Sequence, residues 1–411
     1  MIKEEILKIL EEKEARSMHG QLPVVWSCAD GYYVWDEEGK KYIDFTSTIF
    51  VTNSGHGNRE IGEAVIEQIR KPLIHSYTFP TEIRAKFLQK LSEFTGYDKS
   101  FLVSSGTEAT EVACKLMRMY GLRQNDERKI IVSFAGSMHG RTMLAEQLKG
   151  PNKTNKWAID EVEPVLNIDF PKYNTDIGEV INDLDLYKDC ICGIIFEGYQ
   201  GWSASFYPKE YIKEIYKWAK ENDVLICFDE IQSGMGRTGK KFAYEYYDIK
   251  PDLICLGKAL SNGFPLSAVC SRKEILDIPD IGSMSSTHSA NPIVCAAGLA
   301  NLNYFEQHNL IEEAHRKGKI AKDIIEKKVS DYLRYGKYIK KVNGIGLVYG
   351  FIFDCEATAT KICYKAMEKG LLLVHTGRES IKIGPPLVIA DEVLIEGLNI
   401  FFDSIEEVVN K

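Results

Sequence analysis

Two segments of the chain end an apolar run in residues that can do chemistry. Val224–Asp229 is followed by Glu230, so two acids come at the end of a predicted strand. Pro251–Leu256 is a second apolar run, and Lys258 follows it after one glycine. Burial lowers the pKa of a lysine and leaves its amine free to act as a nucleophile. Taken singly, either segment is also compatible with polar residues that only face water.

A third segment has the residue types that bind phosphate. Ser104–Thr107 leads from a strand pattern into a helical pattern over Glu108–Tyr120. Free backbone N–H groups at a helix start, together with hydroxyl groups, suit a phosphate, although the same residues also make an ordinary helix cap. The polar run Ser285–Ser289 stands ahead of another predicted helix, which would begin near Asn291.

Short apolar runs separated by helical patterns must position these groups. Such runs predict a mostly parallel sheet, and ligands bind at the carboxyl ends of the strands in sheets of this kind. The six runs are Ser100–Ser104, Lys129–Ser133, Gly193–Glu197, Val224–Asp229, Leu253–Leu256 and Leu266–Ser271.

The two ends of the chain have other patterns. Gly31–Trp35 and Lys41–Phe45 predict a hairpin, and the amphipathic first 18 residues predict a surface helix that lacks the features of a signal peptide. We therefore expect an α/β protein. Residues 59–292 would form a large domain around the mostly parallel central sheet. Residues 1–58 and 293–411 would form a smaller α+β domain.

Composition excludes several classes of protein. The formal net charge of −8 gives no general attraction for nucleic acid or an anionic membrane. No stretch approaches the roughly 20 apolar residues that span a bilayer. The ten cysteines have no zinc-type spacing, so we predict no metal site. Scattered cysteines of this kind indicate reduced thiols in a cytoplasmic protein.

Together these segments resemble the class III aminotransferases of the fold type I pyridoxal-phosphate superfamily, over about residues 22–408. The most specific part is Asp229–Gly239, which matches the family pattern D-E-[IV]-Q-[ST]-G-x-G-R-[TS]-G at every fixed position. The lysine of the family motif falls on Lys258. Other family features follow in order at Ser105–Ala109, His139–Thr142, Glu197, Gln200, Gly201, Thr287, Asn291, Pro292 and Pro385–Leu387.

The resemblance implies an aminotransferase that uses pyridoxal 5′-phosphate and a ping-pong mechanism. An amine or amino-acid donor would give its amino group to a carbonyl acceptor. Lys258 would hold the cofactor as a Schiff base and move the proton, and Asp229 would pair with the pyridine nitrogen. The other implied cofactor-binding residues are Ser105, Gly106, Thr107, Met138, His139, Glu197, Gln200 and Thr287.

Four of these residues have a more specific implied contact. Gly106 and Thr107 would bind the cofactor phosphate, and Gln200 would lie near the 3′ oxygen. Thr287 would reach the phosphate from the neighbouring subunit, so the resemblance implies a homodimer. Met138 stands where the family usually has Phe or Tyr, and a thioether can also pack on an aromatic ring.

The residues expected to contact the substrate depart further from the family pattern. Trp202 and Lys382 replace a Glu and an Arg that in many members form a switch around the substrate carboxylate. An ammonium group does not reproduce the planar clamp of an arginine. We expect Trp202 and Tyr199 to add apolar and stacking surface, and Lys382 to offer one positive charge to a carboxylate or phosphate. Phe50 would narrow the substrate entrance. The alternative is that these replacements are simple drift in a peripheral loop. The sequence does not identify the substrate.

Rival functions share parts of the pattern. Gly234–Gly239 also reads G-x-G-x-x-G, which would suit a nicotinamide dehydrogenase, but Asp229–Ser233 separates it from the strand and only a weak helical pattern follows. An amino-acid racemase, epimerase or aminomutase would share Lys258 and Asp229, and loss of the Glu–Arg pair favours these reactions somewhat. The presence of both residues disfavours a non-catalytic binding protein. Transamination is the preferred prediction.

Overall fold

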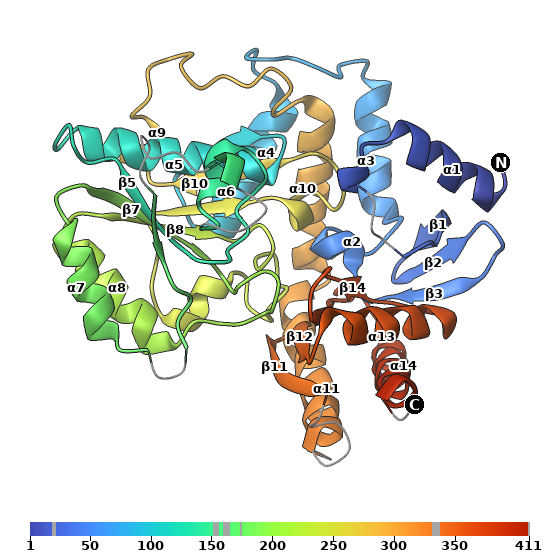
Figure 1. Ribbon diagram of the computed structural model, residues 1–411. Helices are drawn as coiled ribbons and strands as arrows, with labels where there is room; N and C mark the ends of the chain where they lie inside the picture. The colour runs from blue at the N-terminus through green and yellow to red at the C-terminus, as the bar shows by residue number, and fades with distance from the viewer. Residues whose placement is uncertain (19–21, 151–155, 159–164, 173–174, 331–337, 410–411) are drawn as a thin grey trace.

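The computed structural model describes residues 1–18, 22–150, 156–158, 165–172, 175–330 and 338–409. Within these residues the strands form a seven-stranded sheet, with the order β4-β10-β9-β8-β7-β5-β6, and two four-stranded sheets. The large sheet and its helices lie on the left of Figure 1, and both ends of the chain lie on the right. No helix in the described part of the chain is long and apolar enough to cross a membrane.

The seven-stranded sheet is mostly parallel, as predicted. Only β10 runs antiparallel to its two neighbours, β4 and β9, while β9, β8, β7, β5 and β6 pair in parallel. Every residue of β7, β8, β9 and β10 is buried, as expected for a sheet covered by helices on both faces. The strands are β4 Lys99–Val103, β5 Ile130–Phe134, β6 Val165–Ile168, β7 Ile191–Glu197, β8 Leu225–Asp229, β9 Leu253–Leu256 and β10 Ser267–Ser271.

Helices cover both faces of this sheet. Figure 1 shows α5 on one face and α7 and α8 on the other. A capping box begins α5: the Ser105 hydroxyl accepts from the Glu108 N–H, and the Glu108 carboxylate accepts from the Ser105 N–H. The helices of this region are α3 Arg59–Arg70, α4 Glu82–Thr95, α5 Gly106–Leu122, α6 Met143–Gln147, α7 Ile177–Leu186, α8 Lys209–Glu221 and α9 Lys273–Leu276.

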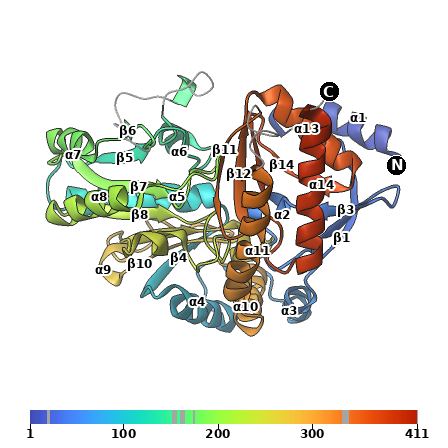
Figure 2. The same cartoon turned by 90° about the horizontal axis from the view of Figure 1, so that it is seen from below.

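The N-terminal strands and the C-terminal chain share a sheet. β2 and β3 form the predicted hairpin, and β13 pairs in parallel with β3. Helices α13 Glu356–Glu368 and α14 Asp391–Val409 contact β13 of this sheet, and Figure 2 shows α14 next to β3. The predicted surface helix is confirmed as α1, Lys3–Lys13, which has no buried residue. The other strands of this sheet are β1 Trp26–Asp30, β2 Tyr33–Asp36, β3 Lys41–Asp44 and β13 Leu371–Leu372.

The third sheet has the order β11-β12-β15-β14, and Lys382 lies on its strand β15. Its strands are β11 Ile339–Ile345, β12 Val348–Phe353, β14 Val374–His375 and β15 Ser380–Ile383. The C-terminal helices are α10 Pro292–Gln307, α11 Leu310–Ser330, α13 Glu356–Glu368 and α14 Asp391–Val409. The domain boundaries after residues 58 and 292 stay a prediction.

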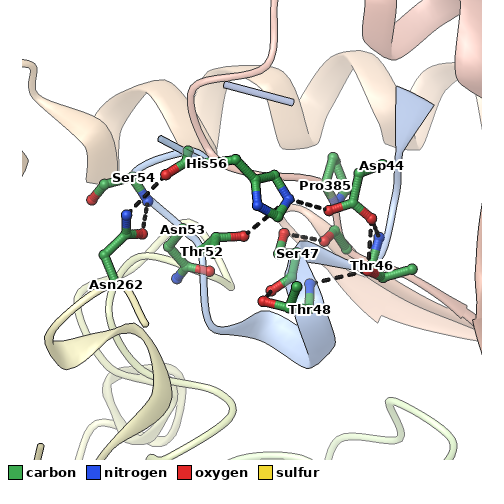
Figure 3. Close-up of polar contacts among 12 residues, drawn as sticks. Asp44, Thr46, Ser47, Thr48, Thr52, Asn53, Ser54, His56, Asn262 and Pro385 are labelled. Carbon is green, nitrogen blue, oxygen red and sulfur yellow. Dashed lines mark hydrogen bonds and ion pairs between the residues drawn. The ribbon is translucent and has the colours of Figure 1, made fainter. Parts of the chain in front are cut away.

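Residues Ser47–Phe50 form α2, which is a left-handed turn. Their φ angles are 44°, 51°, 63° and 64°, although none of the four is glycine. The left-handed conformation costs about 1–2 kcal/mol for each such residue, so other contacts must hold this turn in place. The contacts come from a buried polar cluster that surrounds it (Figure 3).

The polar cluster joins α2 to three other parts of the chain. His56 donates from Nε2 to Asp44 Oδ2 over 2.7 Å, and the other Asp44 oxygen accepts from the Thr46 N–H and hydroxyl. The fully buried Arg237 donates to Ser47 Oγ at 3.2 Å and Asn53 Oδ1 at 2.5 Å. Its other amino group donates to the carbonyls of Leu347 and Pro385. These bonds fix α2 next to the end of β15.

Candidate active site

A cavity of about 210 Å³ lies where β7, β8 and β9 end and α5 begins. Glu197 is the last residue of β7 and Asp229 is the last residue of β8. Lys258 follows β9 after one glycine. The cavity is lined by Gly106, Thr107, Met138, His139, Gly140, Glu197, Tyr199, Asp229, Ile231, Gln232, Ser233 and Lys258. A larger hollow of about 570 Å³ beside α5 has Lys115 and Arg118 at an open surface and no strand end.

Lys258 presents an amine to this cavity. Its backbone has a φ of 43°, and desolvation by the surrounding protein lowers the pKa of its ammonium group, against the opposing effect of Asp229 and Glu197. Among the described residues no acceptor lies within hydrogen-bond distance of its Nζ. A lysine with a lowered pKa and a free Nζ can act as a nucleophile and as a base more readily than an ordinary lysine.

Asp229 is buried, and both of its carboxylate oxygens have a donor. Oδ2 lies 2.9 Å from His139 Nδ1, and Oδ1 accepts from the Ile231 N–H at 3.1 Å. A carboxylate only accepts, so the His139 Nδ1 carries the hydrogen in this pair. The histidine is itself buried, so it holds the carboxylate in one orientation at the cavity wall.

Glu197 is the second carboxyl group of the cavity. Burial raises its pKa to about 7, and the nearby Asp229 adds to the rise while His139 opposes it. Its Oε1 accepts from the Gly201 N–H at 3.0 Å. Its Oε2 and the Nε2 of His139 are buried and have no hydrogen-bond partner among the described residues.

The start of α5 offers donors for an anion. Gly106 and Thr107 are its first two residues and line the cavity, and first-turn N–H groups lack partners within a helix. The Thr107 hydroxyl lies 2.9 Å from the Thr142 hydroxyl. A Cβ on Gly140 would lie 2.1 Å from Thr107 Oγ1, at a φ of 143°, so only glycine allows this close approach. Ser105, by contrast, gives its hydroxyl to the capping box.

These groups fit pyridoxal 5′-phosphate. The cavity combines an amine for the aldehyde, a carboxylate for the ring nitrogen and helix N–H groups for the phosphate. Met138 and Ile231 add apolar surface for the ring. Buried polar atoms without partners, such as Glu197 Oε2 and His139 Nε2, are rare in folded proteins and indicate a place for a bound polar group.

The two glutamines of this region, Gln200 and Gln232, lie in different surroundings. Gln200 does not line the cavity, because its amide donates to the Ala135 carbonyl at 3.1 Å and accepts from the Ser203 hydroxyl at 3.2 Å. Gln232 lines the cavity instead. The sequence analysis missed Gln232, although it belongs to the matched segment and follows Asp229 by three residues. The cofactor contact of Gln200 stays a prediction.

The four predicted substrate residues lie in different surroundings. Tyr199 lines the cavity and donates from its hydroxyl to the Gln232 carbonyl at 3.3 Å. Trp202 is half-buried outside the cavity wall, with the Arg378 guanidinium 5.0 Å from its ring centroid. Phe50 is only 1% exposed, so it packs within the protein instead of facing an open entrance.

Lys382 lies on β15 and is 4% exposed, which excludes a peripheral loop. Its Nζ donates to the Gly201 carbonyl, and to Gln232 Oε1 at 3.0 Å. The same atom lies 4.7 Å from the centroid of the Phe50 ring. Burial, followed by the nearby Lys258, lowers the pKa of Lys382 to about 7. Lys382 therefore lies behind Gln232 and is not part of the cavity wall.

Thr287 lies away from the cavity of its own chain. It is exposed in the turn before α10, and its carbonyl accepts from His75 Nε2 at 2.7 Å. The segment Gly234–Gly239 forms turns, and no helix begins in it. It therefore lacks the helix N-terminus that a dinucleotide-binding site needs, which agrees with the rejection of a dehydrogenase.

The relatives found by comparison with known proteins are aminotransferases. The family model described as aminotransferase class-III matches residues 15–405. An acetylornithine aminotransferase of Caldanaerobacter subterraneus subsp. tengcongensis is 34% identical, over 97% of this chain and 98% of the relative. An ornithine aminotransferase of Staphylococcus carnosus is also 34% identical, over 96% of this chain and 97% of the relative.

Solved structures of aminotransferases have the same fold as this chain. The ornithine aminotransferase from Toxoplasma gondii has a TM-score of 0.92 at 26% identity, over 100% of this chain and 96% of that chain. The acetylornithine aminotransferase from Elizabethkingia anophelis has a TM-score of 0.85 at 31% identity, over 99% and 100%. One Toxoplasma gondii structure is described with partial occupancy of PLP at the active site.

Fold and cavity define a pyridoxal-phosphate-dependent transferase of fold type I. Within that class, the chain belongs to the class III aminotransferases, because the family model covers nearly all of it. The enzyme transfers amino groups between small molecules.

Proposed function

We propose that transamination takes place in the cavity at the ends of β7, β8 and β9, with Lys258 as the residue that holds the cofactor. The observation that carries this proposal is the Lys258 amine, which shares one cavity with Asp229. When bound, pyridoxal 5′-phosphate supplies an aldehyde for the amine and a ring that accepts the electrons left behind by a departing proton.

The protein's own groups would hold the cofactor at three points. Asp229, oriented by His139, would keep the ring nitrogen protonated, since a nearby carboxylate favours the charged form of a base. Gly106 and Thr107 would donate N–H groups to the phosphate. Met138 and Ile231 would pack against the ring from the cavity wall.

Two groups could move protons in the cavity. The lowered pKa of Lys258 favours its free amine, which could take a proton from the substrate carbon and return it one position away. Glu197, with a pKa of about 7, could exchange a proton within the same cavity. A general acid or base works best when its pKa lies near the operating pH, which supports the assignment of Glu197.

We propose an ω-amino acid of the ornithine or acetylornithine kind as the donor. The support is the identity of 34% to curated relatives with these two names. A carbonyl acceptor would then take the nitrogen in the second half of a ping-pong cycle. The donor does not define the acceptor, because Trp202 and Lys382 stand where many members of the family have a Glu and an Arg.

We further propose a cytoplasmic homodimer in which Thr287 of one chain reaches the site of the other. The exposure of Thr287 outside its own cavity supports the shared site. All ten cysteines are free, and reduced thiols are typical of a reducing compartment.

Single half-reactions test the proposed donor. The yellow protein is mixed with ornithine, acetylornithine or glutamate, one at a time and without an acceptor, while the visible absorbance is followed. Loss of the yellow colour with an ω-amino acid, and formation of its carbonyl product, supports the proposal. Exchange of the substrate α-proton with solvent, without that loss and without a carbonyl product, would instead identify a racemase or mutase.

A further inference from the structure

Lys382 is a buried amine whose two hydrogen bonds both point back into the protein. Its acceptors are the Gly201 carbonyl and Gln232 Oε1. No carboxylate of the described residues forms an ion pair with it, and it is absent from the cavity wall. A buried ammonium group without a carboxylate is costly, so the neutral amine is favoured.

The charges around Lys382 also favour the neutral amine. Lys258 and Arg237 disfavour its charged form, and Glu197 is the one group that opposes them among the named causes of its lowered pKa. Phe50 covers another side with its ring. A neutral amine has two N–H groups, and Lys382 has two acceptors. Its donors are therefore fully used within the protein.

The bond to Lys382 decides how Gln232 faces the cavity. Because Lys382 donates to Oε1, the amide oxygen points away from the ligand space. Gln232 also lines that space, so its NH₂ group is the part that it can offer to a ligand. Without a donor at position 382, the amide could turn over and present its oxygen.

We propose that Lys382 is a positioning residue, which fixes the amide of Gln232 with its NH₂ group toward the bound cofactor, and that it does not bind a substrate carboxylate. This inference rests on the proposed function, since it needs the cofactor in this cavity. It also defines the acceptor: recognition would not depend on a charged clamp at position 382, so carbonyl compounds without a second carboxylate would be accepted as well as 2-oxo diacids.

A double-mutant cycle on cofactor affinity tests the positioning role. Lys382→Met, Gln232→Leu and the double variant are prepared without cofactor and titrated with pyridoxal 5′-phosphate. Loss of one oriented hydrogen bond should weaken the affinity of Lys382→Met by about three- to tenfold. In the Gln232→Leu background, the same change should have no further effect, because both residues act through one contact.

Lys317→Met is the matched control. Lys317 is also a buried lysine, and it donates to the Leu387 carbonyl at 2.8 Å, but it does not line the cavity. Its substitution should leave the cofactor affinity unchanged. Failure of the unaltered protein to bind pyridoxal 5′-phosphate would overturn the proposed function itself, whereas this inference depends only on the differences between variants.

Steady-state kinetics with 2-oxoglutarate test for the outcome that would contradict the inference. If Lys382→Met keeps the cofactor affinity of the unaltered protein and raises the KM for this acceptor about tenfold or more, then Lys382 binds the carboxylate and the inference is wrong. If the Lys382→Met variant does not fold, Lys382→Gln takes its place in both measurements. Its uncharged NH₂ group should restore cofactor affinity, while a role in carboxylate binding would again appear as a raised KM.

Discussion

At the scale of the residue, the site contains two lysines with lowered pKa values that affect one another. Lys258 has no acceptor among the described residues, whereas Lys382 is bonded to Gly201 and Gln232. This difference, more than the pKa, separates the nucleophile from the positioning residue. An amine held by two acceptors is poorly placed to act as a nucleophile, because those bonds must break before its nitrogen can move to a carbonyl carbon.

Glu197 gives a pH dependence with a definite sign. Its pKa is raised to about 7 in the folded protein, so its contribution to stability is full at low pH and is lost as the pH rises toward and through about 7. Glu197→Gln removes this titration. We expect the variant without cofactor to gain about 1–3 kcal/mol relative to the unaltered protein between pH 5 and pH 8.

Urea unfolding at the two pH values measures the effect of Glu197→Gln. Glu230 has a similarly raised pKa and remains in both proteins, so the difference between them isolates Glu197. An equal stability difference at pH 5 and pH 8 would mean that Glu197 titrates normally in the folded state.

The residues that the sequence predicted and those that it missed differ in kind. Lys258 and Asp229 could be predicted because each follows an apolar strand, and strand ends meet at one edge of a parallel sheet. The choice between Gln200 and Gln232 depends on the path of each loop after its strand. That path is set by bonds such as the one from Gln200 to Ala135, which no local pattern reveals.

At the scale of the element, strands were predictable where both faces are buried. β6 was missed because all four of its residues are only partly buried and Asn167 interrupts its apolar pattern. The left-handed turn of α2 was missed for another reason. Ser47–Phe50 contains no glycine, and its conformation comes from tertiary bonds of Ser47 to Arg237 and to the Gly384 carbonyl, which lie in other segments.

The polar cluster around α2 should be important for stability. Asp44→Asn removes the charged acceptor of His56 and leaves a buried polar group with a weaker partner. We expect a loss of about 2–4 kcal/mol in the free energy of unfolding, measured by urea denaturation. His56 and Asp44 lie outside the cavity wall. Cofactor affinity in the folded variant should therefore change little, and a loss of affinity with unchanged stability would contradict this assignment.

The start of α5 is the element that should bind the phosphate, and Gly140 tests it. In Gly140→Ala, the new methyl group would collide with Thr107 and would also sit at a φ of 143°. We expect cofactor affinity to fall by about tenfold or more, as measured by titration with pyridoxal 5′-phosphate. Gly282→Ala is a matched control, because it also has a positive φ but open space for a Cβ. Equal effects of the two changes would exclude a specific role for the contact with Thr107.

At the scale of the whole molecule, the N-terminal and C-terminal parts of the chain pair in one sheet. β3 from the N-terminal part pairs with β13 from the C-terminal part, so this four-stranded sheet forms only when distant segments have met. Hydrophobic patterns predicted the separate pieces, but the pairing of β3 with β13 joins strands of only a few residues and leaves no periodic signal. The relative arrangement of these segments was therefore not predictable from local sequence.

The proposed homodimer makes a prediction about mixed subunits. Thr287→Ala and Lys258→Ala proteins are mixed under conditions that allow exchange, at limiting cofactor. If Thr287 serves the neighbouring site, each mixed dimer contains one site with both native residues, and activity above that of either parent should appear. If Thr287 acts within its own chain, or the protein is a monomer, mixing should recover no activity.

The identity of the lysine that holds the cofactor is the central claim. The most direct measurement is reduction of the yellow protein with borohydride, followed by peptide mass spectrometry to locate the phosphopyridoxyl group. The structure predicts one modified residue, Lys258, and no modification of the Lys258→Ala protein. Labelling of Lys382, the other buried lysine beside the cavity, or a labelled Lys258→Ala protein that retains full turnover would contradict the account.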